Sequence, residues 1–378
     1  MTQTLTYNGA AAQLFTFGEG PSAEHHVMLH ATDTLQPFSA QLEAILDAYQ
    51  QLLFQQLPSG TVAVVKRYFL SDAANQADFV VAADASDCAK SIIQQPPLDG
   101  TKVALWAYLV SAATTRITPS GLFEVRHGHY RQLWNASAHN LAVNSEYQTR
   151  LLFNEYIMQL AQEGLTLAAN CVRTWLFVSG IDLNYGGVVR ARNQVFFTQG
   201  LTRDTHFIAS TGIGGRAQDA SVLTQMDNYA VDGLQPGQVT YLYAPTHLNR
   251  TSDYGVSFER GTAVDYGDRR HVIISGTASI DNKGQIVHPG DVAQQTRRVW
   301  ENVGALLAEA GCTFDDVAHM IVYLRDLSDY QLVSQLYAQR FPGKPLVIVH
   351  APVCRPGWLI EMECMAVKAQ YNNNFPPY

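Results

Sequence analysis

An internal repeat constrains the fold of this chain more than any other feature of its sequence. The tripeptide Gln-Thr-Arg at 148–150 recurs at 295–297, and Gly164 recurs as Gly311 at the same spacing, with no gap between the two copies. A spacing that is kept over this length indicates that one structural unit has been duplicated within the chain. The two copies are therefore expected to share a fold.

The residues after each tripeptide predict the same succession of elements. Apolar residues recur at helical spacing over 151–163 and 299–310, and each segment ends at one of the two repeated glycines. A β-rich run follows in both copies, at 172–178 and at 318–324. Helices with these stop signals followed by strands predict an α+β unit in which helices cover one face of a mixed sheet.

The start of the chain carries a third, weaker copy. We expect a helix at 38–56, a strand at 61–70, a second helix at 85–95 with Asp84 as its N-cap, and a strand at 103–110. This layout mirrors the end of the chain. The elements expected there are a helix at 292–310, a strand at 319–324, a helix at 330–340, and strands at 346–350 and 359–367.

Three similar modules follow from these copies. We place them near residues 1–115, 116–245 and 246–370, with an unstructured tail at 371–378. Three modules in one chain could imitate a homotrimer with fewer working clefts than a true trimer has, which predicts a monomer or a weak dimer. The alternative is that the duplication only enlarged the core.

Charge and composition exclude several classes of protein. The formal net charge of −8 and the absence of clustered Lys and Arg argue against a general nucleic-acid binder. No basic segment followed by an apolar one opens the chain, and no run of about 18 apolar residues occurs, so we expect a cytoplasmic protein. Five widely spaced cysteines without a CxxC pair suit reduced thiols.

The sequence contains no convincing motif for a metal or a cofactor. His127 and His129 would share a strand face, but no cluster of Cys, Asp or Glu ligands accompanies them. We find no phosphate-binding loop, dinucleotide fingerprint or nucleophile elbow between a strand and a helix. We therefore expect neither a bound metal nor a cofactor.

Glu361 is unusual because its neighbours have the composition of a buried strand. The segment 359–365 reads Leu-Ile-Glu-Met-Glu-Cys-Met, and strand alternation places Glu361 and Glu363 on one face, roughly 7 Å apart. Burial and a neighbouring carboxylate both raise the pKa of a carboxyl group, which can then stay protonated and act as a general acid. The alternative is a strand whose polar face meets water or bonds buried backbone.

Two motifs give the last third of the chain a family resemblance. Residues 272–281 read Val-Ile-Ile-Ser-Gly-Thr-Ala-Ser-Ile-Asp, and His-Pro-Gly-Asp at 288–291 leads into the second Gln-Thr-Arg helix. Residues 354–363 read Cys-Arg-Pro-Gly-Trp-Leu-Ile-Glu-Met-Glu. These segments resemble the Rid/YjgF superfamily, also called endoribonuclease L-PSP-like, and within it the chorismatases. The resemblance extends over 245–370 and, less closely, over 140–216.

The resemblance to chorismatases implies a cofactor-independent hydrolase or lyase with a small anionic substrate. Such an enzyme would cleave the enol ether of chorismate, or of a close relative, into pyruvate and a cyclic carboxylic acid, with Glu361 delivering the proton. Arginines would bind the substrate carboxylates, because a planar guanidinium meets a carboxylate with two hydrogen bonds. The arginine candidates are Arg173 first, then Arg190, Arg192, Arg325 and Arg355. The further candidates for substrate contact are Thr211 and Gly212 in a glycine-rich turn, Tyr254, His350, Cys354 and Glu363.

Two other functions remain open at this point. In Rid deaminases, which hydrolyse enamines or imines, the anchoring arginine resembles one near the start of the penultimate strand. The corresponding segment here, 346–350, contains no arginine, which favours the chorismatase-like interpretation. The other alternative is a protein that kept the fold and binds a small ligand without turnover.

Overall fold

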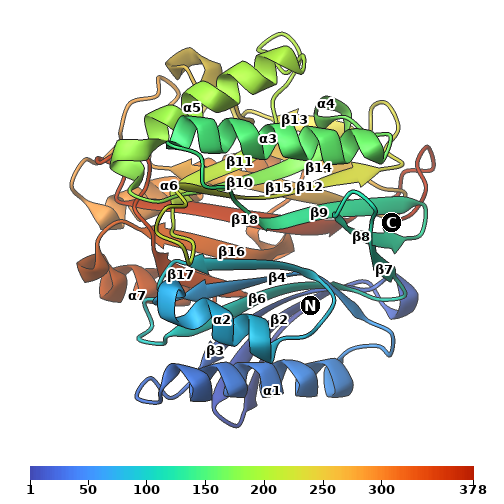
Figure 1. Cartoon of the computed structure of the whole chain (residues 1–378), viewed down its shortest axis with the longest axis vertical. Coiled ribbons are helices and arrows are strands. Elements are labelled where there is room, and N and C mark those ends of the chain that lie inside the picture. The colour runs from blue at the N-terminus through green and yellow to red at the C-terminus, as the bar shows by residue number, and fades with distance from the viewer.

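The computed structural model describes residues 1–378 as three six-stranded mixed sheets with helices on their outer faces (Figure 1). All three sheets have one strand order, in which the sixth strand lies between the third and the fourth. The fourth and fifth strands of each sheet are parallel, and the other neighbours are antiparallel. The prediction of an α+β fold built from three similar units is confirmed.

The elements have the following bounds. The first unit contains β1 Thr2–Tyr7, β2 Ala10–Phe17, β3 Glu24–Ala31, α1 Phe38–Gln56, β4 Val62–Leu70, α2 Ala73–Ala83, β5 Ala89–Gln94 and β6 Val103–Val110. The second contains β7 Thr114–Ile117, β8 Phe123–His127, β9 Tyr130–Ala138, α3 Ser145–Gln162, α4 Leu167–Asn170, β10 Cys171–Val178, α5 Ile181–Thr198, β11 Ala209–Gly214 and β12 Thr224–Asp232. The third contains β13 Val239–Leu242, β14 Gly261–Asp265, β15 Arg269–Ala278, α6 Val292–Glu309, β16 Val317–Leu324, α7 Tyr330–Arg340, β17 Leu346–His350 and β18 Ile360–Ala369. The module limits at 115 and 245 stay a prediction.

The repeated glutamine performs the same task in both copies. Gln148, on α3, accepts hydrogen bonds from the backbone N–H groups of Leu223 and Thr224, where the chain enters β12. Gln295, on α6, accepts from the N–H of Leu359, where the chain enters β18. A buried backbone donor without a partner is costly, so each glutamine satisfies donors that the sheet leaves unpaired. This explains why the repeat is centred on a polar residue in a buried helix face.

The helix α6 shows how the sequence pattern becomes packing. The Asp291 side chain caps its N-terminus by accepting from the N–H of Gln294. Val299, Val303 and Leu306 recur at helical spacing and are fully buried against β15 and β18. The helix ends before Gly311, whose φ of 70° belongs to the left-handed region that favours glycine. Start, buried face and stop are those that the sequence predicts.

The helix predicted at 85–95 is wrong. The helix of this part of the chain is α2, which precedes Asp84, and residues 89–94 form the strand β5 with every second side chain buried. Asp84 starts no helix, because its carboxylate accepts from Lys66 Nζ at 3.0 Å and from the Tyr68 hydroxyl at 2.7 Å. A buried lysine requires such a partner, and this requirement is invisible in local sequence.

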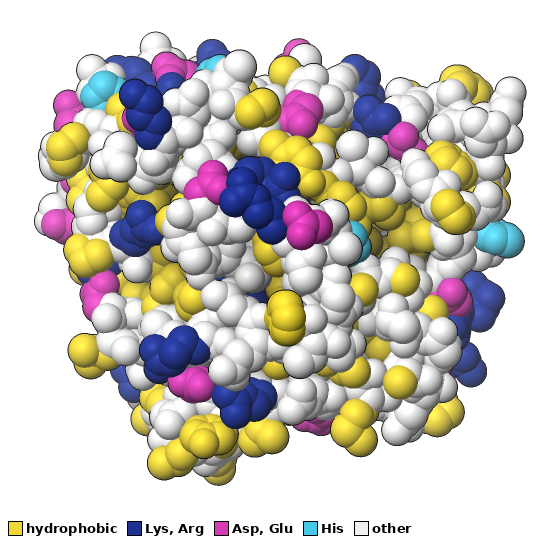
Figure 2. Space-filling view, turned by 90° about the horizontal axis from the view of Figure 1, so that it is seen from above, with side chains coloured by type: hydrophobic (Ala, Val, Ile, Leu, Met, Phe, Trp, Pro, Cys, Tyr) yellow, Lys and Arg dark blue, Asp and Glu magenta, His cyan; other side chains and the backbone are white.

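A common core joins the three sheets. One cluster of 63 buried hydrophobic residues contains side chains from every sheet, among them Met28, Trp134 and Val272. The inner sheet faces therefore pack together, while α1 and α2 cover one side of the molecule and α3 and α5 the opposite side (Figure 1). Figure 2 shows the molecule from above, where basic and acidic side chains are interspersed between hydrophobic ones. None of the helices is both long and apolar enough to cross a membrane.

The tail predicted to be unstructured is instead packed against the core. The backbone of Pro376 accepts from the N–H of Gly267, and Tyr378 is only 5% exposed. The Tyr378 hydroxyl lies 2.7 Å from that of Tyr108 and accepts from Gln132 Nε2 at 2.5 Å. The prediction failed because the segment is polar and contains prolines, and its packing against the core depends on one aromatic residue, Tyr378.

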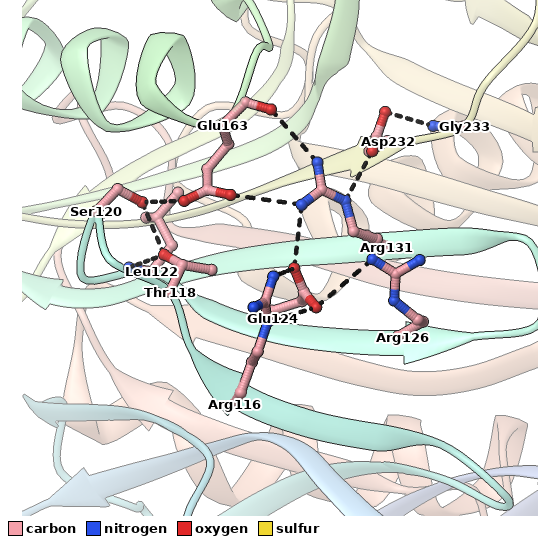
Figure 3. A network of polar contacts seen from close by, with 10 residues as sticks. All are labelled: Arg116, Thr118, Ser120, Leu122, Glu124, Arg126, Arg131, Glu163, Asp232 and Gly233. Carbon is pink, nitrogen blue, oxygen red and sulfur yellow. Dashed lines mark hydrogen bonds and ion pairs between the residues drawn. The ribbon is translucent and has the colours of Figure 1, made fainter.

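A polar network fastens the edge of the second sheet to its helix (Figure 3). Arg131 on β9 donates to Asp232 on β12 at 2.7 Å, to Glu124 on β8 at 3.1 Å and to Glu163 after α3 at 3.4 Å. Arg116 on β7 meets Glu124 with two further bonds. The network joins four neighbouring strands to the end of α3.

Candidate active site

A cavity with a volume of about 260 Å³ lies where the second and third units meet. Its walls come from α5 and β11 of the second unit, and from β15, β18 and three loops of the third unit. The apolar lining residues are Val189, Val256, Phe258, Ala278, Ile280 and Trp358.

Glu361 brings the carboxyl group of β18 into this cavity. The side chain is 4% exposed and lies directly against Gly276 of β15, since a Cβ built on that glycine would be 2.1 Å from Glu361 Oε1. Burial raises the pKa of Glu361 to about 8, and the charge of Glu363 adds to this effect, while Arg173 and Arg260 oppose it. At neutral pH Glu361 therefore lies in the cavity as a neutral acid.

Glu363 lies behind the cavity and forms an ion pair with Arg173. Its Oε2 accepts from Arg173 Nη2 at 2.8 Å, and its Oε1 accepts from Trp175 Nε1 at 2.7 Å. Arg67, from the first unit, approaches Oε1 to 3.9 Å. The two carboxyl groups on one face of β18 thus differ in surroundings: one has three partners, and the other has none in the protein.

Arg173, the first candidate for a substrate carboxylate, does not line the cavity. It is 1% exposed, and its Nη2 donates to the Thr211 hydroxyl at 2.6 Å as well as to Glu363. The same hydroxyl accepts from the N–H of Gly276. Arg173 and Thr211 therefore support the backbone and the carboxylate behind Glu361, and the structure places neither of them against a ligand in this cavity.

Three other guanidinium groups do line the cavity. Arg192 on α5 is 1% exposed, and its Nε and Nη2 have no partner in the protein. Arg260 is oriented by the Asn249 carbonyl, to which its Nε and Nη2 donate. Arg355 lies between the rings of Tyr254 and Trp358, 4.7 and 4.8 Å from their centroids. The cavity thus combines a neutral acid with three cations.

Several predicted contacts lie elsewhere. Arg190 is 64% exposed and pairs with Glu146 on the surface. Arg325 donates to Asp182 and to a backbone carbonyl, and His350 faces the Arg325 carbonyl oxygen at the edge of a neighbouring cleft. The prediction of a glycine-rich turn is wrong, because residues 209–214 form the strand β11, which pairs with β10. Within that strand, Gly212 still lines the cavity, as do Tyr254, Cys354 and Arg355.

Among the lining residues that the sequence did not single out are two with polar side chains of chemical interest, Tyr185 and Arg260. Tyr185 stands on α5 among polar and small residues and reaches over the cavity from the second unit. Arg260 precedes β14 and has no local pattern around it. A tyrosine or arginine of this kind resembles any surface residue until the fold brings the two units together, so no local signal could have found either one.

An altered copy of the acid arrangement occurs between the first and second units. A bulge precedes the pairing of Thr277 with Met362 in the third sheet, and a matching bulge precedes that of Ala138 with Met226 in the second. The position of Glu361 is therefore taken by Gln225, and that of Glu363 by Asp227. Asp227 accepts from Arg67 at 2.9 Å, as Glu363 does from Arg173.

In that copy a glutamine, Gln225, replaces the acid, and its side chain is hydrogen-bonded to the protein. The Gln225 side-chain amide donates to the backbone oxygen of Ile92 at 3.0 Å and lies 3.3 Å from the Ser137 hydroxyl. Ser137 lies in the bulge, where the third sheet has Gly276, and adopts a φ of 55°. Of these two related places, only the one at Glu361 offers an acid that the protein leaves free.

Comparison with known proteins agrees with the sequence motifs. The family model described as endoribonuclease L-PSP matches residues 262–368. The 3-aminoacrylate deaminase RutC of Acinetobacter baylyi is 36% identical over 97 residues, which are 25% of this chain and 77% of that protein. A RutC family protein of Pyrococcus abyssi is 37% identical over 99 residues, or 26% of this chain and 78% of that protein.

A solved structure matches the whole architecture. The crystal structure of a chorismatase superposes with a TM-score of 0.67 over 92% of this chain and 100% of its own, at 18% sequence identity. That likeness shows a shared three-unit fold, and the identity over the third unit shows the family. The chain therefore belongs to the Rid/YjgF superfamily, of which the endoribonuclease L-PSP and RutC proteins are members.

Proposed function

We propose that this chain is a cofactor-independent enzyme that cleaves the enol ether of chorismate, or of a close relative, into pyruvate and a cyclic carboxylic acid. The observation that carries the proposal is Glu361, a buried neutral carboxyl group in a cavity with three guanidinium groups. An enol ether requires a proton on its methylene carbon before its ether bond breaks, and a carboxyl with a pKa near 8 can supply that proton at neutral pH.

The proposed reaction balances without an added reagent other than water. Glu361 transfers its proton to the methylene carbon, and the carbon that bears the ether oxygen becomes an oxocarbenium ion. Water adds to that carbon, the bond between it and the ether oxygen breaks, and pyruvate leaves, while the ether oxygen stays on the ring. The Glu361 carboxylate accepts one proton of the water, which restores the acid, and the other proton passes to the ether oxygen as the bond breaks, so that the ring keeps a hydroxyl group.

The other lining residues fit an anionic, partly apolar substrate. Arg192 presents two unpartnered N–H groups, which matches the two oxygens of a carboxylate. Arg355 and Arg260 offer a second cationic region for a second carboxylate. The apolar wall formed by Val256, Phe258 and Ile280 suits a carbon ring.

The relatives support a second candidate. One of them is a 3-aminoacrylate deaminase, and its similarity covers the unit that carries Glu361. Hydrolysis of an enamine also begins with a proton on carbon and ends with the addition of water, so the same acid would serve it. That reaction requires only one cationic anchor, whereas this cavity contains three.

The test compares pyruvate release from chorismate, read with lactate dehydrogenase, with hydrolysis of a freshly generated enamine. We expect pyruvate release by the wild type and a loss of about 100-fold or more in Glu361→Gln, which keeps the shape of the neutral acid but has no acidic proton. Arg190→Ala, on the surface, is the matched control and should keep the wild-type rate. Activity on the enamine alone would establish the second candidate. Folded wild type without either activity would favour a non-catalytic binding protein.

A further inference from the structure

We infer that Tyr185 holds the water molecule that attacks the oxocarbenium carbon, and so determines whether the reaction ends in hydrolysis or in elimination to an aromatic hydroxy acid. In the elimination, the bond between the ring carbon and the ether oxygen breaks, pyruvate leaves with that oxygen, and the ring gives a proton to the Glu361 carboxylate as it becomes aromatic. The inference rests on the proposed function. It assigns a positioning role to a residue of the second unit, whereas the acid belongs to the third.

The placement of Tyr185 depends on a close contact with β11. Its ring lies against Gly212, where a built Cβ would be 2.8 Å from Tyr185 Cε2 and 3.2 Å from the hydroxyl oxygen. Carbon atoms do not approach to 2.8 Å, so a side chain at position 212 would displace the ring. Gly212 thereby brings a hydroxyl group from α5 over the floor of the cavity.

The Tyr185 hydroxyl is a neutral group whose only hydrogen-bond partner in the protein is the thiol of Cys354. A thiol is a weak partner, so the hydroxyl keeps most of its capacity to bind a water molecule. Burial raises the pKa of Tyr185, and the neighbouring Cys354 thiol and, more weakly, Glu361 add to the effect. The phenol therefore keeps its proton and can both donate and accept.

The attacking water needs a hydrogen-bond acceptor, and few lining groups provide one. Guanidinium groups only donate, so Arg192, Arg260 and Arg355 cannot accept a proton from water. The Ser210 hydroxyl already accepts from Thr174 at 2.8 Å. These contacts leave the arginines for the carboxylates of the substrate.

The remaining acceptors differ in strength and surroundings. Tyr254 packs against two guanidinium groups, with Arg355 at 4.7 Å and Arg260 at 5.5 Å from its ring. Burial and the charge of Glu361 raise the pKa of the Cys354 thiol to about 12, so that it stays an undissociated and weak acceptor. Tyr185, bonded only to the weak Cys354 thiol, is thus the strongest acceptor left in the cavity, where a water molecule can give one hydrogen to the tyrosine and the other to the Glu361 carboxylate.

The experiment separates the ring products by chromatography while pyruvate is followed. For Tyr185→Phe we expect pyruvate release to persist and the ratio of hydrolysis product to aromatic product to fall at least tenfold. Tyr147→Phe, which removes the hydroxyl of a half-exposed tyrosine on α3 outside the cavity, is the control and should keep the wild-type ratio. An unchanged ratio in Tyr185→Phe would overturn the inference, as would an equal loss of both products.

A second variant and the products of the wild type distinguish the remaining outcomes. If Tyr185→Phe does not fold, Gly212→Ala displaces the same ring from the other side and should shift the ratio in the same direction. If the wild type makes only the aromatic product, Tyr185 holds no attacking water and the inference fails, while the proposed cleavage stands. If the wild type releases no pyruvate, it is the proposed function that fails.

Discussion

Arg173 forms its ion pair with Glu363 and not with Glu361, although both carboxyl groups lie on the same face of β18. The distance from Arg173 Nη2 to Glu363 Oε2 is 2.8 Å, and both side chains are almost completely buried. Glu363 is committed to this ion pair, whereas Glu361 forms no ion pair and burial raises its pKa, which keeps it neutral at pH 7. This division makes Glu361 suited to proton transfer.

Removal of Arg173 is expected to destabilise the fold strongly. Arg173→Met leaves the Glu363 charge buried without its main partner, which costs about 3–5 kcal/mol in the free energy of unfolding. The double variant Arg173→Met, Glu363→Met should recover part of this loss, because no buried charge remains. Urea denaturation measures both.

Arg190→Ala serves as the comparison for that experiment. Arg190 pairs with Glu146 at the surface and is 64% exposed, so its loss should change the stability by less than about 1 kcal/mol. Equal losses in the free energy of unfolding for Arg173→Met and Arg190→Ala would contradict the difference in burial between the two arginines. The sequence alone ranks these two arginines only by family resemblance.

The pH dependence of turnover should follow the protonation of Glu361. Its active form is the neutral acid, so the rate should be level below pH 8 and fall about tenfold per unit above the pKa of about 8. Initial rates of pyruvate release between pH 6 and 10 test this. A profile that rises through this range would show that the carboxylate is the active form.

The raised pKa of Glu361 should also make the stability of the fold depend on pH. The pKa of Glu361 is raised from an ordinary value of 4.5 to about 8, so the folded state favours the protonated form. The contribution to stability is complete below pH 4.5 and is lost as the pH rises through 8. The stability of the wild type should therefore fall, relative to Glu361→Gln, by on the order of 4 kcal/mol between pH 5 and 9.

Gly276 should be essential for activity, although it carries no functional group. A methyl group at this position would lie 2.1 Å from Glu361 Oε1, so Gly276→Ala must displace the carboxyl group from its place in the cavity. We expect at least a 100-fold loss of pyruvate release, since a displaced acid no longer meets the methylene carbon.

A second glycine provides the control for that substitution. Gly304 lies inside α6, where an added Cβ would approach only Phe314, at 3.4 Å. Gly304→Ala should keep full activity and gain up to about 1 kcal/mol in stability, because alanine favours the helix. Wild-type turnover by Gly276→Ala would mean that Glu361 does not act from its present position.

The parts of the fold that the sequence predicted are those with a local signal. The helix at 330–340 and the strand at 346–350 have the predicted bounds, because periodic apolar residues and flanking glycines or prolines mark them. The segment at 85–95 failed because its strand depends on pairing with β4 rather than on its own composition. The sequence indicated Glu361 as a candidate acid because its charged side chain interrupts an apolar run.

The rest of the site depends on contacts between distant residues. Arg173 is separated from Glu363 by 190 positions, so the sequence could not show that its guanidinium is already occupied. Tyr185 and Arg260 enter the cavity only because the second and third units meet there. A pattern within one segment can reveal which residues are buried, but it cannot reveal which partner satisfies them.

Tyr378 should contribute to stability, although it lies in the part of the chain that the sequence predicts to be unstructured. Tyr378→Phe removes the hydroxyl that lies 2.7 Å from that of Tyr108 and that accepts from Gln132. Tyr108 keeps its bond to Glu24, but the buried Gln132 amide loses an acceptor, which should cost about 1–3 kcal/mol in the free energy of unfolding. Tyr371→Phe, at a position that is 94% exposed, should change the stability by less than about 0.5 kcal/mol. If thermal denaturation gave the two variants equal midpoints, the packing of the tail against the core would be wrong, and the expectation of an unstructured tail would be correct.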